Sequence, residues 1–155
     1  MSSSHSPSTE LPSAVLFCCT MNSVRSPMAE GIMKRYHGRR IYVESVGVRP
    51  GAEVDGFAVA VMEEIGIDLT PHRSRIFDEL EDSSFDVVVS LSPEAQHKAV
   101  DMVRWMACEV EFWNTFDPSL VEGSREIRLE AYRKIRDELI DKILARFPVP
   151  HMQSG

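Results

Sequence analysis

A cysteine and an arginine, Cys19 and Arg25, are separated by five residues near the start of the chain. A thiolate is a strong nucleophile, and a planar guanidinium can hold two oxygens of a tetrahedral oxyanion. The five residues between them are enough for the chain to curl, so that its backbone N–H groups converge on one anion. The spacing therefore predicts chemistry on a bound oxyanion, with Cys19 as nucleophile and Arg25 as the anion-binding cation.

The residues around this pair strengthen the prediction. Residues 14–18 form an apolar run typical of a strand that is buried on both faces. Ser26 and Pro27 are typical of a helix start, with Ser26 as the cap. Asn22 tolerates the left-handed backbone that a tight loop requires. By itself the pair also fits an alternative, in which Cys19 is a buried strand-end thiol and Arg25 a solvated surface side chain.

Residues 19–26, called the anion loop below, are thus expected to connect a strand to a helix N-terminus. The unpaired N–H groups and positive dipole end of a helix attract anions. They also favour the ionised form of a nearby thiol, so Cys19 is expected to react as a thiolate. Ser26 is expected to donate a hydrogen bond to its sulfur.

The rest of the chain reads as alternating strands and helices. Apolar runs and β-branched residues predict strands over 14–18, 41–46, 85–91 and 109–113. Helical spacing predicts helices over 26–37, 54–65 and 93–105, and a long final helix containing residues 127–143. This order predicts an α/β fold, a three-layer α/β/α sandwich around a four-stranded parallel sheet with Rossmann-like or flavodoxin-like topology. Ligands of such sheets bind beyond the carboxyl ends of the strands, where the anion loop begins.

Length and composition limit the possible classes of protein. The 155 residues suit a single domain over 13–150, preceded by a disordered leader over 1–12 and followed by a tail over 151–155. A net charge of −7 argues against broad nucleic-acid or acidic-membrane binding. The three cysteines, Cys18, Cys19 and Cys108, form no disulfide or zinc pattern, so a reducing, cytoplasmic location is expected.

Residues 15–30, VLFCCTMNSVRSPMAE, resemble the signature of the low-molecular-weight protein tyrosine phosphatases. Further blocks follow in family order. Residues 44–47 resemble the Ser-Ala-Gly stretch after the second strand, residues 66–68 and 72–74 resemble the Gly-Ile-Asp and His-Arg-Ser segments, and Asp117-Pro118 resembles the late Asp-Pro. The resemblance extends from Ala14 to the last expected helix and implies a cysteine-dependent hydrolase of phosphomonoesters, with protein phosphotyrosine as the expected substrate.

The resemblance also implies roles for individual residues. Cys19 would form a cysteinyl-phosphate, Arg25 would bind the phosphoryl oxygens, and Asp117 would protonate the leaving group and then activate water. Supporting roles fall to Asn22, Ser26 and His72, the last as hydrogen-bond partner of Asn22. The phosphate would be bound by Thr20, Met21, Asn22, Ser23, Val24, Arg25 and Ser26. On the residues alone, Asp117 is equally a turn residue and His72 a loop residue.

The implied partners are a phosphorylated protein or a small phosphomonoester, with inhibition by phosphate or vanadate. No metal and no cofactor are expected, because amides and Arg25 supply the positive field. Cys18 is expected to be a core residue, since neighbouring side chains of a strand point to opposite faces. Cys108 is expected to be a packed thiol.

Four features depart from the family pattern. Met21 stands where such loops usually carry glycine, which would cost about 1–2 kcal/mol if that backbone is left-handed. Val24 replaces a second loop cysteine. Ser119 and Leu120 follow Asp117-Pro118 where phosphotyrosine-specific members have aromatic residues, and residues 48–50 also lack an aromatic side chain to stack on a substrate ring. Arg49 in that segment is a candidate for recruiting an acidic substrate.

Two other functions remain open. A thiol-dependent arsenate reductase shares this fold and the loop pattern that Asn22-Ser23 resembles. Its thioredoxin-coupled type carries two further cysteines after the third strand, where this chain has Ser90-Leu91-Ser92-Pro93, so an external thiol would be needed. A non-catalytic oxyanion-binding module is the third interpretation, suggested by Met21 and the missing aromatic walls.

Overall fold

The computed structural model describes residues 11–81 and 84–150. The strands are β1 (Ala14–Cys19), β2 (Tyr42–Gly47), β3 (Val87–Ser90) and β4 (Glu109–Phe112). The α-helices are α1 (Arg25–His37), α2 (Gly56–Glu63), α3 (Pro93–Met102) and α4 (Arg125–Arg146). Short 3-10 helices cover Phe77–Glu79, Val103–Trp105 and Pro118–Leu120.

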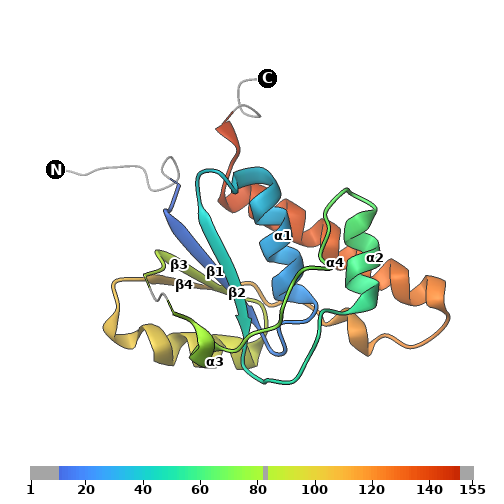
Figure 1. Cartoon of the computed structure of the whole chain (residues 1–155), viewed down its shortest axis with the longest axis horizontal. Coiled ribbons are helices and arrows are strands. Elements are labelled where there is room, and N and C mark those ends of the chain that lie inside the picture. The colour runs from blue at the N-terminus through green and yellow to red at the C-terminus, as the bar shows by residue number, and fades with distance from the viewer. Residues whose placement is uncertain (1–10, 82–83, 151–155) are drawn as a thin grey trace.

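The four strands form one parallel sheet in the order β2-β1-β3-β4. All six residues of β1 are buried, as expected for a central strand covered on both faces. The chain leaves β1 toward one face of the sheet through α1 and leaves β3 toward the other face through α3 (Figure 1). The gap between the carboxyl ends of β1 and β3 is therefore the topological switch point, where open α/β sheets bind ligands.

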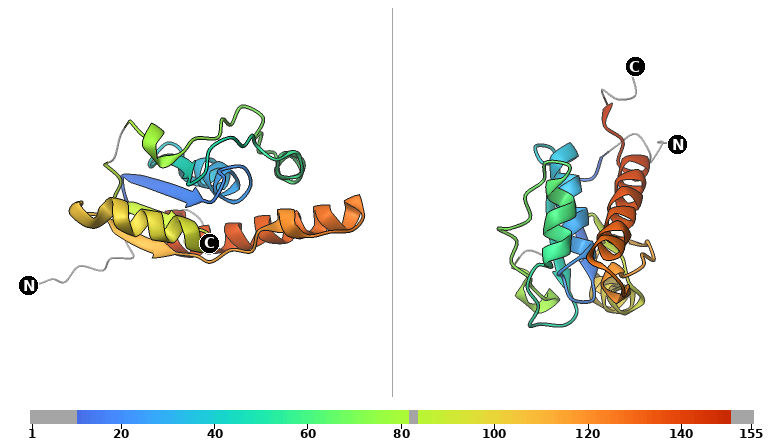
Figure 2. Two further views of the ribbon diagram at one scale, coloured as in Figure 1. Left: turned by 90° about the horizontal axis from the view of Figure 1, so that it is seen from below. Right: turned by 90° about the vertical axis from the view of Figure 1, so that its right-hand side faces the viewer.

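Helices cover both faces of the sheet, which confirms the three-layer α/β/α prediction. The odd-numbered side chains of β1, including Phe17, pack with α1 and α4. Helix α2 packs against α4, and Figure 2 shows the helices around the sheet from two further sides. The even-numbered side chains, including Leu16, pack on the opposite face with Phe77 and with Ala95 and Ala99 of α3. Among the described residues, no helix has both the length and the apolar character that crossing a membrane requires.

The element boundaries differ from the predicted ones in a few places. α1 begins at Arg25, one residue early, and Ser26 is not its cap, because its hydroxyl is engaged by other groups. α2 is shorter than the predicted 54–65 helix, since Asp55 caps its first turn and Gly66 has a φ of 80° that ends the helical path. The helix predicted over 93–105 finishes as a 3-10 turn after Met102.

The chain termini were predicted to lie outside the domain. Leu11 was included in the expected leader, but in the structure it is partly buried against the core on the α1 side of the sheet. Residues 1–10 and the tail 151–155 lie outside the described residues.

Candidate active site

The anion loop lies at the carboxyl end of β1, where the sequence placed it. Cys19 is the last residue of β1, and Arg25 is the first residue of α1. The loop backbone also contacts the segment after β2, because the carbonyl oxygen of Thr20 accepts the N–H groups of Val48 and Arg49 at 2.8 and 2.9 Å. The loop is thus fixed between two strand ends and the N-terminus of a helix.

The left-handed position in the loop is Asn22, with a φ of 57°. Among the described residues Asn22 is the only non-glycine with positive φ, so Met21 does not carry the strain that a left-handed backbone would have imposed. Gly47 of β2 makes the fold of the loop possible. A Cβ atom at Gly47 would lie 2.7 Å from both Asn22 N and Met21 C, which is too close for any side chain.

Cys19 has its sulfur within reach of two donors from the start of α1. The hydroxyl of Ser26 is 2.9 Å from Cys19 Sγ, and the backbone N–H of Ser26 lies 3.4 Å from it. Because Asn22 Nδ2 donates to Ser26 Oγ at 2.8 Å, the hydroxyl hydrogen of Ser26 is free to point at the sulfur. Both donors stabilise negative charge on the sulfur.

Asn22 is fully buried and uses all of its amide group. Its Nδ2 donates to Ser26 Oγ and to Ser45 Oγ at 2.8 and 3.0 Å, and its Oδ1 accepts the backbone N–H of Arg75 at 2.9 Å. His72 Nε2 is 3.1 Å from the same Oδ1, the partner that the resemblance predicted. Such a saturated buried network holds a single loop conformation.

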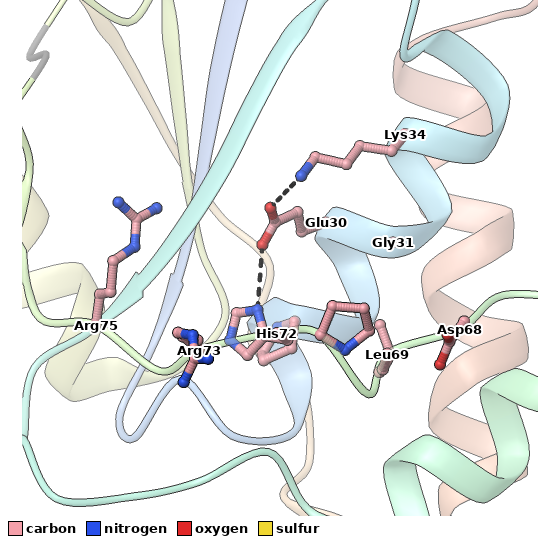
Figure 3. A pocket seen from close by; sticks show the side chains of 10 residues that line it. Glu30, Gly31, Lys34, Asp68, Leu69, His72, Arg73 and Arg75 are labelled. Carbon is pink, nitrogen blue, oxygen red and sulfur yellow. Dashed lines mark hydrogen bonds and ion pairs between the residues drawn. The ribbon is translucent and has the colours of Figure 1, made fainter.

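His72 joins this network to a pocket behind the anion loop. The pocket, of about 390 Å³, lies between α1 and the segment 68–75, with His72 and Glu30 facing each other in it (Figure 3). His72 Nδ1 is 3.7 Å from Glu30 Oε1, and Glu30 also pairs with Lys34 at 2.7 Å. Burial lowers the pKa of His72 below its ordinary value, and the nearby Glu30 carboxylate only partly opposes this shift. A neutral His72 with its Nε2–H donated to Asn22 fits these contacts.

Arg25 is held from the strand ends on the other side of the site. Its Nη1 donates to the carbonyl oxygen of Thr115 at 2.8 Å and approaches that of Leu91 at 3.5 Å. Only 8% of Arg25 is exposed. Its guanidinium is oriented by the two carbonyl groups, which follow β3 and β4. This arrangement leaves the remaining donors for an anion at the loop.

Asp117 lies beside Arg25, with its Oδ2 3.8 Å from Arg25 Nη2. Its Oδ1 accepts the N–H and hydroxyl of Ser119 at 3.0 and 2.7 Å, so the carboxylate caps the 3-10 helix Pro118–Leu120. The structure therefore brings together the three residues predicted to be catalytic, Cys19, Arg25 and Asp117, at one edge of the sheet.

The other loop residues have structural contacts of their own. Thr20 Oγ1 donates to the Oγ of Ser92, the cap of α3, at 3.0 Å. The carbonyl oxygen of Ser23 accepts the N–H of Asp55 at 2.9 Å. Val24 is buried in the core on the α1 side of the sheet.

The two other cysteines lie away from the anion loop. Cys18 points to the opposite face of the sheet, where its thiol approaches Val89 O at 3.6 Å and its pKa is raised well above the ordinary value by burial and by Cys19. Cys108 precedes β4, at the amino-end edge of the sheet. Burial raises the pKa of its thiol, and the nearby carboxylates of Asp86 and Glu109 raise it further. Cys18 is a core residue, as predicted.

The rim of the site combines charged and apolar side chains. Arg49, a candidate for recruiting acidic substrates, forms an ion pair with Glu94 of α3 at 2.9 Å. Phe116 and Leu120 flank Asp117 in the sequence and are 56% and 69% exposed. Apolar surface is thus present beside Asp117, although Ser119 and Leu120 follow Asp117-Pro118 and neither is aromatic.

Several residues that shape the site were not predicted. Ser45 and Glu30 complete the network of Asn22, and Thr115 orients Arg25 through its carbonyl oxygen. Asp55 caps α2 with its Oδ1 and receives the hydroxyl of Tyr132 on Oδ2 at 3.1 Å. Only Asp55 had a recognisable sequence signal, an acidic residue directly before a helical pattern.

The fold and the loop define a class of protein with an oxyanion site built on a thiol and a guanidinium. The family model of the low molecular weight phosphotyrosine protein phosphatases matches residues 14–146. The chain therefore belongs to this family, as the resemblance implied.

Known relatives include both phosphatases and reductases. An arsenate reductase of Bacillus subtilis (strain 168) is 33% identical over 129 residues, 83% of this chain and 91% of that protein. The solved structure of a low molecular weight protein tyrosine phosphatase from T. tengcongensis is 29% identical, with a TM-score of 0.70, over 86% of this chain and 98% of that one. A structure described as an arsenate reductase in the phosphate binding state is 30% identical, with a TM-score of 0.66, over 84% and 93% of the two chains.

Proposed function

We propose that the protein is a cysteine-dependent phosphatase that hydrolyses phosphomonoesters, including phosphotyrosine in proteins. The sulfur of Cys19 attacks phosphorus, forming an S–P bond, while the P–O bond to the leaving group breaks. Arg25 and the loop N–H groups hold the three equatorial oxygens, and protonated Asp117 gives its proton to the departing oxygen.

The second half-reaction restores the enzyme. Water attacks the phosphorus of the cysteinyl-phosphate and gives its proton to the Asp117 carboxylate, and the S–P bond breaks as Cys19 leaves as a thiolate. Ser26 stabilises this sulfur in both halves through its hydroxyl and N–H donors, which lie at 2.9 and 3.4 Å from Cys19 Sγ.

The observation that carries the proposal is the placement of the three cysteines. Reduction of arsenate requires two electrons from thiols, so that a second thiol must attack the Cys19 sulfur and release arsenite as a disulfide forms. Cys18 is buried on the opposite face and Cys108 lies at the amino-end edge of the sheet. The chain's own residues therefore favour transfer of the phosphoryl group to water over reduction by a second thiol.

Arsenate reduction with an external thiol is the second candidate function. The identity to arsenate reductases favours it. In this reaction the sulfur of a small thiol or of a dithiol protein would attack the Cys19 sulfur, the S–As bond would break, and arsenite would leave with its electron pair. A second thiol would then reduce the disulfide left on Cys19 and restore the enzyme.

The apolar rim supports an aryl phosphate as substrate. The exposed side chains of Phe116 and Leu120 stand beside Asp117, where the ring of a phosphotyrosine would leave the site. Phosphate and vanadate should compete with the substrate, because both fit the same donors.

The test is hydrolysis of p-nitrophenyl phosphate with and without vanadate. Cys19→Ser should reduce turnover to background while phosphate binding, measured by calorimetry, persists, and the matched control Cys108→Ser should retain activity. Turnover by Cys19→Ser at the wild-type rate would show that the nucleophile is wrong. Phosphate binding by the wild-type protein without turnover would indicate a non-catalytic oxyanion module instead.

A parallel assay addresses the second candidate. The protein is incubated with arsenate and glutathione, and arsenite is measured. Steady arsenite release together with negligible turnover of p-nitrophenyl phosphate would replace the phosphatase proposal with the reductase one.

A further inference from the structure

The arginines of α4 divide into two groups. Three of them pair with carboxylates: Arg133 with Glu64, Glu126 and Glu130, Arg136 with Glu64 and Asp137, and Arg146 with Glu109 and Glu111. Within residues 11–81 and 84–150, the first two arginines of the helix, Arg125 and Arg128, have no carboxylate partner. Their guanidinium carbons instead lie 5.5 and 4.4 Å from the ring centre of Phe57.

Arg128 also carries an unsatisfied donor. Its Nε is buried and has no hydrogen-bond partner, although the residue as a whole is only half-buried. Buried donors are normally paired with an acceptor, and Arg128 Nε is an exception. The guanidinium is held instead by a cation–π contact with the ring of Phe57. Its positive charge is therefore not neutralised within the described part of the protein.

Phe57 connects these arginines to the anion loop. Its ring packs on Tyr132 with the ring centres 5.3 Å apart, and Tyr132 donates its hydroxyl to Asp55. The backbone N–H of Asp55 in turn donates to Ser23 of the loop at 2.9 Å. The Arg125, Arg128 and Phe57 group, called the arginine surface below, thus stands on the α2 side of the same site.

A guanidinium stacked on a ring keeps its N–H edge available for a carboxylate. The chain has a net charge of −7, which repels acidic partners in general. The two arginines, which have no carboxylate partner, place a positive patch beside the site that can attract such partners. The charge is complementary to an acidic segment of a substrate protein.

We propose that the arginine surface binds acidic side chains flanking the phosphorylated residue of a protein substrate. This proposal rests on the phosphatase function proposed above. It assigns substrate selection to Arg125 and Arg128, whereas Arg49 is already paired with Glu94.

The test compares two phosphotyrosine peptides that differ only in having glutamates or glutamines on both sides of the phosphorylated residue. The readout is the ratio of their kcat/KM values, which cancels changes in the chemical steps. At low ionic strength the wild-type ratio should favour the acidic peptide about threefold to tenfold, as expected for one or two exposed ion pairs. It should fall toward one in 0.5 M salt, where such pairs are screened.

The double variant Arg125→Gln/Arg128→Gln should abolish the preference. Arg125→Gln alone should roughly halve it, and this variant guards against loss of folding, because Arg125 is exposed. Arg104→Gln is the matched control, since Arg104 is an exposed arginine on the other face of the sheet and, among the residues that the structure describes, forms an ion pair with Asp101 alone. Its ratio should equal that of the wild type.

Three results would overturn the proposal: a wild-type ratio of one, an unchanged ratio in the folded double variant, or an equal loss in Arg104→Gln. A dimer that the double variant loses in light scattering, with an unchanged ratio, would assign the surface to a second copy. If neither peptide is hydrolysed, the phosphatase function fails, and fluorescence anisotropy of the same peptides on Cys19→Ser still measures the preference separately.

Discussion

Asp117 occupies the position where a leaving group would need a proton. Its carboxylate is bonded through Oδ1 to Ser119, while Oδ2 faces Arg25 at 3.8 Å. Arg25 is itself held by Thr115, so both partners are oriented before a substrate arrives. A residue with this geometry is expected to matter most when the leaving oxygen is a poor leaving group.

We therefore predict a dependence on the leaving group for Asp117→Asn. The value of kcat/KM for phenyl phosphate should fall by about 10²–10⁴-fold, as for loss of a general acid, whereas p-nitrophenyl phosphate should be affected far less. A series of substituted phenyl phosphates measures this as a steeper slope against the leaving-group pKa. Asp101→Asn, an exposed carboxylate of α3, is the control. Equal losses for good and poor leaving groups would remove Asp117 from the role.

The residues that sequence reasoning identified best are those with a local chemical signature. Cys19, Arg25 and Asn22 lie within one loop, and its left-handed residue is Asn22, as its side chain suggested. Ser45 and Glu30 were missed, because a serine and a glutamate acquire their roles only through contacts with Asn22 across the fold. Of the two roles predicted for Ser26, the helix cap was wrong, whereas its hydroxyl does lie within hydrogen-bond distance of the Cys19 sulfur.

At the scale of elements, the end of β2 and the anion loop fit together through Gly47. Its N–H donates to Arg75 O at 2.7 Å, and its Cα faces the backbone of residues 21 and 22. A side chain added at Gly47 would meet backbone atoms of residues 21 and 22, which cannot move aside as the end of a flexible side chain could. The loop conformation therefore depends on a residue that makes no contact with a substrate.

Gly47→Ala should destabilise the protein and weaken oxyanion binding together. Because the added methyl group would lie 2.7 Å from loop backbone atoms, we expect the free energy of unfolding to fall by about 1–3 kcal/mol. Urea unfolding and phosphate calorimetry measure the two effects. The control is Gly56→Ala, where nothing lies within 4 Å of the added atom. A stable Gly47→Ala protein with wild-type phosphate affinity would contradict the close-approach argument.

The fold itself was largely predictable from the order of strands and helices. β1 and β3 are apolar runs, and α3 and α4 are each preceded by a serine, Ser92 or Ser124, whose side chain caps the helix as serines usually do. The strand order β2-β1-β3-β4 was not fixed by the pattern, because right-handed crossovers allow several orders, depending on which face of the sheet each connection crosses. The length of α2 was not predictable from spacing, because apolar residues beyond its ends pack against the core without being helical.

At the scale of the whole molecule, the buried His37 and the partly buried His72 couple the fold to pH. His37 is 1% exposed, and its Nε2 bonds to Phe147 O at 2.7 Å, close to the end of α4. Burial lowers the pKa of His37, as it lowers that of His72, although the bond to Phe147 opposes the shift. One histidine thus lies under the anion loop, while the other fastens the C-terminal helix to α1.

The sign of the pH effect follows from these lowered pKa values. Below about pH 6.5 the unfolded chain takes up protons that the two folded histidines do not, so the folded state loses stability as the pH falls. Above that range both states are neutral, and this contribution is constant. The free energy of unfolding should therefore stay nearly constant from pH 7.5 to 6.5. From pH 6.5 to 5.5 it should decrease by roughly 0.5–1 kcal/mol per pH unit.

Urea unfolding at pH 7.5, 6.5 and 5.5 tests this on the wild type and three variants. His72→Gln keeps a donor for Asn22 and should flatten the dependence, as should His37→Gln, because neither variant can take up the extra proton in the unfolded state. His97→Gln, which replaces an exposed histidine of α3, should leave the slope unchanged. A wild-type stability that rises as the pH falls from 6.5 to 5.5 would mean that His72 is protonated in the fold and paired with Glu30. The anion loop would then be supported by a cation at His72, and the neutral donor assigned to Asn22 would be wrong.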